Sequence, residues 1–317
     1  MQEVLNFGVD VAKAELVIGV VGHPQRNTTI PNADGPIKRW LKTVPSGSRI
    51  AVESTGEYHS RVIALAQERG FAAYVLNARD VYFYAKALGQ RGKTDRVDAQ
   101  LISRYVREHH DRLHTFHAGS PVEQEVNQLL RRRAALVMHQ GGIAQSLKGL
   151  GSLEGGARAL RAQVDRVLEQ IDQRIEALIA SQDDLAASAQ QIRTVPGIGA
   201  QGAALLTCLF RRIDFAHEDA LVAFTGLDPR PMDSGQKHGK RRLSKRGPAL
   251  LRRQLFMMAF SASRTKLFKP VYEALRARGL SSTASFVILG RKLLKIAFAL
   301  WRTQKPFAPE RWIAKNA

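Results

Sequence analysis

The chain has 317 residues, enough for two or three domains with a sizeable core. It carries 48 lysines and arginines against 28 aspartates and glutamates, a formal net charge of +20. Such an excess indicates a polyanionic partner, most often nucleic acid, although a basic protein at a membrane surface has the same balance. No apolar run is long enough to span a membrane, no signal segment opens the chain, and a single cysteine excludes a disulfide framework and a cysteine-rich zinc site. We expect a soluble, cytoplasmic, nucleoid-associated protein without a membrane partner.

Strands and helices alternate along roughly the first 115 residues. We expect strands over residues 4–10, 14–21, 49–52 and 71–76, and helices over residues 36–42, 59–69 and from residue 95 onward. This alternation predicts an α/β layer fold. Two of the strands end on an acid, because Asp10 closes the first strand and Glu53 follows residues 49–52. In both places a carboxylate follows directly after an apolar strand.

Asp95 and Asp98 lie three residues apart at the start of a predicted helix that Thr94 can cap. Acids in a first turn also suit the positive end of the helix dipole, so stabilisation of the helix alone explains such a pair. Here the pair follows a basic segment, residues 86–93, where merely stabilising acids have no special reason to lie. Two close carboxylates that both stay charged favour a divalent cation, and their hard oxygen ligands suit magnesium.

Together, four acids stand at strand ends and at a helix start within one α/β unit: Asp10, Glu53, Asp95 and Asp98. An RNase H-like sheet gathers such positions around a two-metal site for phosphodiester chemistry. Two magnesium ions about 4 Å apart can activate the attacking oxygen and stabilise the leaving one. Each acid taken alone is equally well read as a surface or capping residue, and it is the ordered set that predicts a metal site.

A helical hairpin is predicted next. Ser120 to Glu123 read as a capping box with proline at the first helical position, and glycines at 149–156 break the helix that follows. The second helix has near-heptad apolar positions, interrupted by Arg174, at Leu160, Val164, Val167, Ile171 and Leu178. We expect a coiled coil. Whether its apolar stripe meets its own partner helix or another chain is open at this stage.

The remaining third of the chain is predicted to be mainly helical and strongly basic. Residues 196–199 (PGIG) before a helix resemble the turn of helix-hairpin-helix modules, whose amides hold a DNA phosphate, although an ordinary tight turn has the same sequence. The residues we expect to contact nucleic acid are Lys93, Arg96, Gly197, Gly199, Lys237, Lys240, Arg241, Arg242, Lys245 and Arg246.

These motifs, in this order, resemble the DEDD-type insertion-sequence transposases, the bridge-RNA-guided recombinases to which the pilin-gene invertases also belong. The matching segments run nearly from end to end: 8–13 (GVDVAK), 53–56 (ESTG), 93–99 (KTDRVDA), 196–199 (PGIG), 224–230 (FTGLDPR), 234–235 (SG) and 244–247 (SKRG). The resemblance implies an α/β plus α fold: a RuvC-like (RNase H-like) domain over residues 1–115, a coiled-coil hairpin over 116–185 and a mainly helical C-terminal transposase domain over 186–317.

The resemblance also implies a bacterial enzyme that cuts and rejoins DNA of a mobile element. The four acids would bind magnesium, and Ser234 would be the nucleophile, activated because a serine hydroxyl alone is a weak one. Ser244, in the same basic patch, is the alternative hydroxyl. The implied partners are donor and target DNA, a structured noncoding guide RNA and further copies of the chain, in a dimer or tetramer. The serine would complete the metal site of a neighbouring copy.

Three other functions are compatible with parts of the same pattern. A RuvC-like junction nuclease would not need Ser234. An actin-like or sugar-kinase ATPase also opens with Gly-Val-Asp and a strand hairpin, but its second Asp-x-Gly phosphate loop is not found in the sequence. A non-catalytic nucleic-acid-binding protein with a decayed nuclease fold would not need to retain all four acids and the serine.

Overall fold

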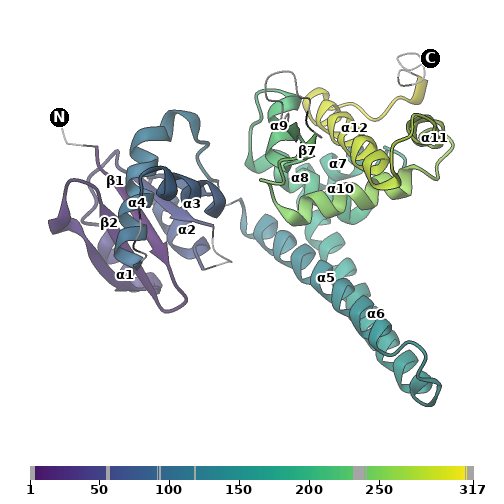
Figure 1. Cartoon of the computed structure of the whole chain (residues 1–317), viewed down its shortest axis with the longest axis horizontal. Coiled ribbons are helices and arrows are strands. Elements are labelled where there is room, and N and C mark those ends of the chain that lie inside the picture. The colour runs from purple at the N-terminus through teal and green to yellow at the C-terminus, as the bar shows by residue number, and fades with distance from the viewer. Residues whose placement is uncertain are drawn as a thin grey trace. The chain divides into compact units, whose positions relative to one another are not determined.

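The computed structural model describes residues 4–54, 58–90, 92, 94–117, 119–230, 239, 241–310 and 312. The chain divides into two compact units, Met1–Ala118 and Gly119–Ala317. In Figure 1 the first unit is purple to blue and the second is teal to yellow. The first unit is built on a sheet. The described part of the second unit is helical apart from one short ribbon of two strands.

A five-stranded sheet of order β3-β2-β1-β4-β5 forms the first unit. Its strands are β1 (Asn6–Val11), β2 (Glu15–Val20), β3 (Thr28–Pro31), β4 (Arg49–Glu53) and β5 (Ala72–Leu76). β1 is antiparallel to β2 and parallel to β4, and β4 is parallel to β5, so the sheet is mixed. The sequence pattern missed β3, a mostly exposed four-residue strand at the edge of the sheet.

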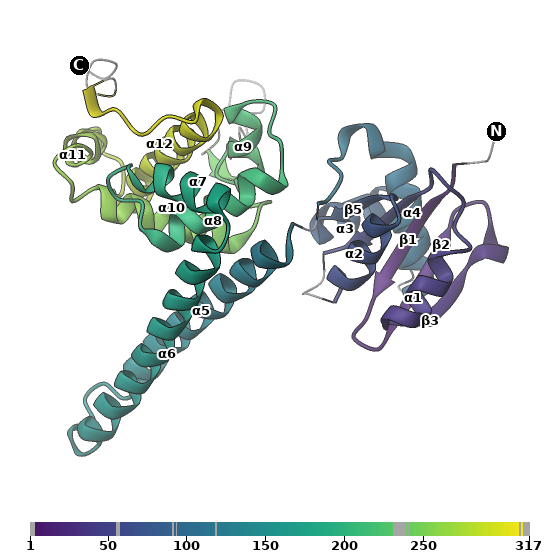
Figure 2. The ribbon, with the colours of Figure 1, turned by 180° about the vertical axis from the view of Figure 1, so that it is seen from behind.

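Helices cover both faces of this sheet (Figures 1 and 2). They are α1 (Asp34–Leu41), α2 (Ser60–Glu68), α3 (Ala78–Ala87) and α4 (Asp95–His109), with short 3-10 turns η1 (Pro24–Arg26) and η2 (His110–Arg112). Side chains alternate along each strand, so Phe7 and Val9 pack with α1 and α2, whereas Ala51 and Tyr74 pack with α4. Helix α3 was not expected; Val81 is its only buried residue.

Helix α4 lies in direct backbone contact with the sheet. A Cβ atom added to Gly8 of β1 would lie 2.0 Å from the carbonyl oxygen of Ala99, and one added to Gly19 of β2 would lie 2.7 Å from the backbone nitrogen of Gln100. Only glycine lets a helix approach a strand this closely. The two glycines therefore fix the depth at which α4 lies on β1 and β2.

The predicted hairpin is formed by α5 (Pro121–Ser146) and α6 (Glu154–Ala180), which run side by side in Figures 1 and 2, with a 3-10 turn η3 (Gly151–Leu153) between them. The capping box is confirmed. The Ser120 hydroxyl accepts a hydrogen bond from the Glu123 N–H at 3.2 Å, and the Glu123 carboxylate accepts one from the Ser120 N–H at 2.5 Å. Arg133 joins the two helices by a two-pronged ion pair to Asp172, at 2.6 and 2.8 Å.

The apolar stripe of α6 differs from the expected one. Leu160 and Val167 are 45% and 44% exposed, whereas Leu168 and Ile175 are buried. The covered positions 164, 168, 171, 175 and 178 follow steps of four and three residues, which keep them on one helix face. Arg174 does not interrupt this face, because its side chain lies beside the stripe and pairs with an acid of α5.

The rest of the second unit is a cluster of helices. Its elements are α7 (Asp183–Arg193), α8 (Ala200–Arg212), α9 (Glu218–Thr225), β6 (Pro229–Arg230), β7 (Arg242–Leu243), α10 (Ala249–Ala262), α11 (Lys269–Ala277) and α12 (Ser282–Thr303). Helix α8 is buried over most of its length, and α5, α6, α7, α10 and α12 contribute to the same core. Across the described residues, none of the helices is both long and apolar enough to cross a membrane.

Candidate active site

The sheet brings two of the predicted acids onto adjacent strands. Val9 of β1 pairs with Val52 of β4 in parallel register. Asp10 and Glu53 each come one residue later, so they are neighbours across two strands that lie about 4.8 Å apart. Both residues are half-buried. The carboxyl ends of β1 and β4 therefore present two acids side by side.

Both acids face the side of the sheet that α4 covers. The Cβ position of Gly8 points at the backbone of α4, and Asp10, two residues further along the same strand, points to the same side. Ala51 belongs to the core cluster that includes α4, and Glu53 is two residues beyond it. The alternation of side chains thus directs Asp10 and Glu53 toward the same layer.

Helix α4 runs antiparallel to β1, which directs its first turn toward these acids. The Ser103 hydroxyl donates to the first carbonyl of β1 at 2.7 Å, while Ala99 lies against Gly8. Four helical residues advance about 6 Å and two strand residues about 6.6 Å, so helix and strand stay in step. Four residues before Ala99 on α4 is Asp95, and two residues after Gly8 on β1 is Asp10. The same spacing therefore brings Asp95 level with Asp10.

The start of α4 is built as the sequence predicts. The Thr94 hydroxyl accepts a hydrogen bond from the Val97 N–H at 3.3 Å, and the Asp98 N–H donates to the Thr94 carbonyl at 2.9 Å. Asp95 is exposed and Asp98 is half-buried. Both aspartates lie in the first helical turn, at the positive end of the helix dipole.

The donor chemistry of this edge suits magnesium, which prefers carboxylate oxygens. As the side chains are placed, no group of three or more His, Cys, Asp or Glu within the described ranges lies close enough to hold a metal ion. The backbone brings the acids to one edge of the sheet, and a shared ion would require their side chains to turn inward. Asp95, whose side chain is exposed, has room to do so.

The predicted nucleophile, Ser234, lies outside the described residues, as do three of the predicted basic contacts: Lys93, Lys237 and Lys240. The two ends of the segment that contains Ser234 are described. β6 and β7 form an antiparallel ribbon in which Pro229 pairs with Leu243 and Arg230 with Arg242. The ribbon therefore brackets residues 231–241.

The alternative hydroxyl, Ser244, is buried, with 6% of its surface exposed. Its hydroxyl donates to the carboxylate of Asp228, and its N–H donates to the carbonyl of the same residue at 3.1 Å. These two bonds tie the end of β7 to the start of β6. A hydroxyl held in this way closes the ribbon and has little room to meet a DNA phosphate. Sequence reasoning gave Asp228 no role, although an acid directly before a proline and a strand was a visible signal.

Two of the sequence motifs, residues 224–230 and 244–247, pack directly against each other. The Lys245 N–H donates to the Gly226 carbonyl at 2.9 Å. Gly226 has φ +70°, and a Cβ atom on it would lie 2.6 Å from the backbone nitrogen of Arg246. A Cβ atom on Gly247 would lie 1.9 Å from the carbonyl oxygen of Phe224. Glycine is needed at both positions, so the motifs are the two sides of one tight junction.

The predicted basic contacts are open to solvent wherever the structure describes them. They are Arg96, Arg241, Arg242, Lys245 and Arg246. Four of them flank or follow the ribbon, so the strand ends carry a concentrated positive charge. That charge suits the phosphate backbone of a nucleic acid.

The two glycines before α8 differ in their surroundings. Gly197 has φ +98°, and a Cβ atom on it would lie 2.5 Å from the Cα atom of Ala262 in α10, so close helix packing explains this glycine. Gly199 is exposed, and among the described residues a Cβ atom on it would meet nothing within 4 Å. The N-terminal amides of α8 therefore border open space, where an anion can approach them.

Cys208 is the one thiol of the chain, and the structure excludes it as a nucleophile. It lies in the core of the second unit on α8. Burial, with a further contribution from the charge of Glu123, raises the pKa of the thiol to about 12. The reactive thiolate is therefore scarce at neutral pH.

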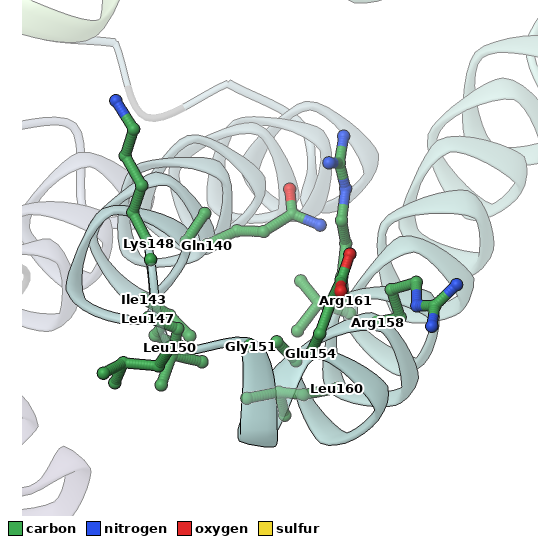
Figure 3. A pocket seen from close by; sticks show the side chains of 14 residues that line it. Gln140, Ile143, Leu147, Lys148, Leu150, Gly151, Glu154, Arg158, Leu160 and Arg161 are labelled. Carbon is green, nitrogen blue, oxygen red and sulfur yellow. The ribbon is translucent and has the colours of Figure 1, made fainter.

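A hollow of about 440 Å³ lies at the turn between α5 and α6 (Figure 3). Apolar side chains such as Leu147, Leu150 and Leu160 line it, while the ammonium group of Lys148 points away (Figure 3). Glu154 is the only acid among its lining residues. The hollow lacks the paired carboxylates that phosphodiester chemistry needs, so it is not the candidate active site.

Comparisons with known proteins identify relatives of both units of the chain. A DEDD-type IS110 transposase model matches residues 7–150, which include all four acids, and a model described as Transposase IS116/IS110/IS902 family matches residues 189–273. The chain is also similar to the pilin gene-inverting proteins of Moraxella bovis and Moraxella lacunata, each 27% identical over 319 residues, with 95% of this chain and 97% of the relative covered. Taken together, these matches identify the chain as an insertion-sequence transposase of the DEDD type, a DNA-recombining enzyme.

Proposed function

We propose that this transposase cuts and rejoins DNA with Ser234 as nucleophile and with magnesium held by Asp10, Glu53, Asp95 and Asp98. The observation that carries the proposal is the step-for-step alignment of α4 with β1, which directs the acids of α4 toward those at the strand ends. The sheet order β3-β2-β1-β4-β5 supports an RNase H-like, RuvC-like fold for residues 1–115. Residues 116–185 would then be the coiled-coil hairpin and residues 186–317 the transposase domain.

Magnesium, when bound, would polarise the attacked phosphate and lower the pKa of the attacking hydroxyl. The carboxylates of the sheet unit would hold and orient the ions. The exposed cations around the β6–β7 ribbon would bind the phosphates on either side of the cut.

In the chemical step, the Ser234 hydroxyl loses its proton and its oxygen forms a bond to a DNA phosphorus. One bridging phosphorus–oxygen bond breaks, and the departing strand takes up a proton as a free hydroxyl. The phosphoserine link conserves the ester, so attack by another strand's hydroxyl reverses the step and rejoins DNA without an external energy source.

A structured noncoding RNA is proposed as the guide that selects the DNA sites. The net charge of +20 supports a large polyanionic partner. The names of the pilin gene-inverting relatives indicate that DNA inversion is one outcome open to the same chemistry. RNA that copurifies with the chain, sequenced and found complementary to two DNA sites, would support this part, and nuclease-treated protein that still selects its sites would refute it.

The site is proposed to be composite, with Ser234 of one chain completing the acid site of a neighbouring chain. Two long helices, of 26 and 27 residues, separate the acids from the serine along the chain. The test mixes two inactive variants, Ser234→Ala and Asp10→Asn, on DNA that carries the recombination sites. Cleavage partly returns if the sites form between chains. No recovery, with assembly verified by light scattering, would place the whole site within one chain.

Magnesium binding is tested apart from activity by titration calorimetry of the intact chain. Asp10→Asn is nearly isosteric and should abolish magnesium-specific heat, because one shared ligand is lost. Asp111→Asn is the matched control, since this exposed acid follows α4 at its far end. Equal magnesium binding by both variants would refute the assignment of Asp10 as a ligand.

A further inference from the structure

A cavity of about 210 Å³ lies beside the β6–β7 ribbon. Side chains from the ribbon region, α10 and α12 line it: Leu227, Leu243, Leu255, Phe256, Phe286 and Val287. Its volume is below the roughly 300–1,000 Å³ of sites for drug-sized ligands. The cavity therefore has room for a single ring system and not for an extended molecule.

One wall of the cavity is aromatic and held in place. The rings of Phe256 and Phe286 meet edge to face, with centroids 5.2 Å apart. On its other side Phe286 is stacked on Tyr272, with centroids 4.8 Å apart and planes 14° apart. Both phenylalanines are only half-buried, so part of each ring remains uncovered. A flat ring that enters finds a stacking surface already in position.

Among the residues that the structure describes, three cations and no acid complete the lining: Lys245, Arg252 and Arg253. Arg252 is anchored, because its guanidinium donates to the carbonyls of Thr225 and Gly247. Lys245 and Arg253 are exposed. Within the described residues neither of these two side chains forms an ion pair or a hydrogen bond. An apolar, aromatic interior with two available cations is complementary to a flat ring attached to a phosphate chain.

We propose that this cavity receives one unpaired nucleobase of the DNA strand, while Lys245 and Arg253 bind the phosphates next to it. Enzymes that act on nucleic acids commonly hold an unstacked base between aromatic and apolar side chains, and cations track the backbone. The inference rests on the proposed function in one respect: the DNA strand that the proposed transposase cuts is the one expected in this cavity.

Photochemical crosslinking tests the proposal with the full-length Ser234→Ala chain, which is expected to bind DNA without cutting it. The probe is a ten-residue oligodeoxythymidylate with 5-iododeoxyuridine in place of thymidine, and the comparison is the corresponding RNA probe with 5-iodouridine. The expected result is a DNA crosslink to Phe256, in the tryptic peptide of residues 254–264, or to Phe286, in that of residues 279–291.

Two variants change the cavity in opposite ways. Val287→Trp fills it, and Phe256→Ala removes one of its walls. Met257→Trp is the matched control, because this residue of the same helix is 48% exposed and does not line the cavity. Stacking of one base predicts a loss of affinity for the DNA probe of roughly 5- to 150-fold in either cavity variant. The control should bind as before, and thermal unfolding verifies that each variant is folded.

The outcomes separate this proposal from the proposed function. Crosslinks that persist in Val287→Trp, or that map only outside the two peptides, would overturn the nucleobase site. Crosslinking by the RNA probe alone would overturn the choice of DNA. Because all readouts are of binding by a variant that lacks the serine, none of these results bears on Ser234 or the acids, which the mixing experiment tests.

Discussion

The two units of the chain position their candidate catalytic groups by different means. In the sheet unit, hydrogen-bonded backbone fixes the acids, because Asp10 and Glu53 each follow a residue paired in the sheet. In the helical unit, the segment that contains Ser234 is held at its ends, by two-residue strands and by the bonds between Ser244 and Asp228. The placement of Asp10 and Glu53 is therefore a property of the sheet, whereas in the helical unit the structure describes only the ribbon on either side of the segment that contains Ser234.

The largest effect is expected from removing one acid of the sheet edge. Asp10→Asn should lower the rate of strand cleavage on the order of 10³-fold, since a metal ion contributes several kcal/mol of charge stabilisation. The variant should keep its circular dichroism spectrum and its midpoint of thermal unfolding. Cleavage at the normal rate would show that the register of β1 and β4 does not build the active site.

A second change tests whether contact between α4 and β1 sets the position of the acids. Gly8→Val should lower the free energy of unfolding by about 3 kcal/mol or more, because a side chain there collides with the backbone of α4. Gly142→Ala is the control, since this helical glycine has open space around it and alanine should be neutral or stabilising. Denaturant titration measures both, and a harmless Gly8→Val would refute the close approach.

Sequence reasoning was most successful where local rules and long-range packing agree. The caps at Thr94 and Ser120 were predictable because each is a hydroxyl residue directly before a stretch with helical apolar spacing. Helix α3 and strand β3 were missed because neither buries a regular stripe. The order of the acids along the chain pointed to a common site, but their approach depends on Gly8 and Gly19, whose role appears only once the helix lies on the sheet.

The apolar stripe of α6 includes Leu168, one residue after the position that the heptad pattern predicted, Val167. Leu168→Ala should lower the free energy of unfolding by about 2 kcal/mol, near the low end for a buried leucine, because a two-helix hairpin can partly close the gap. Val167→Ala, one residue earlier and 44% exposed, should change it by less than about 0.5 kcal/mol. Equal effects from the two substitutions would contradict the burial of Leu168 in place of Val167 and favour the stripe predicted from the sequence.

The smallest effect is expected at the bond that closes the ribbon. Ser244→Ala should lower the free energy of unfolding by about 1 kcal/mol, since a hydrogen bond to a charged, half-buried carboxylate is lost. Cleavage should slow without disappearing, because the hydroxyl holds the ribbon and does not attack DNA. Complete loss of cleavage with normal stability would give Ser244 a chemical role.

Identification of the residue that becomes joined to DNA tests the central claim most directly. The wild-type chain is stopped during reaction by denaturation, the DNA is digested to a short tag, and mass spectrometry locates the modified side chain. The account predicts a phosphoserine link at Ser234, which is absent from Ser234→Ala and from Asp10→Asn and retained in Ser244→Ala. A link at Ser244, or a cleaved strand with no link to the protein, would contradict it.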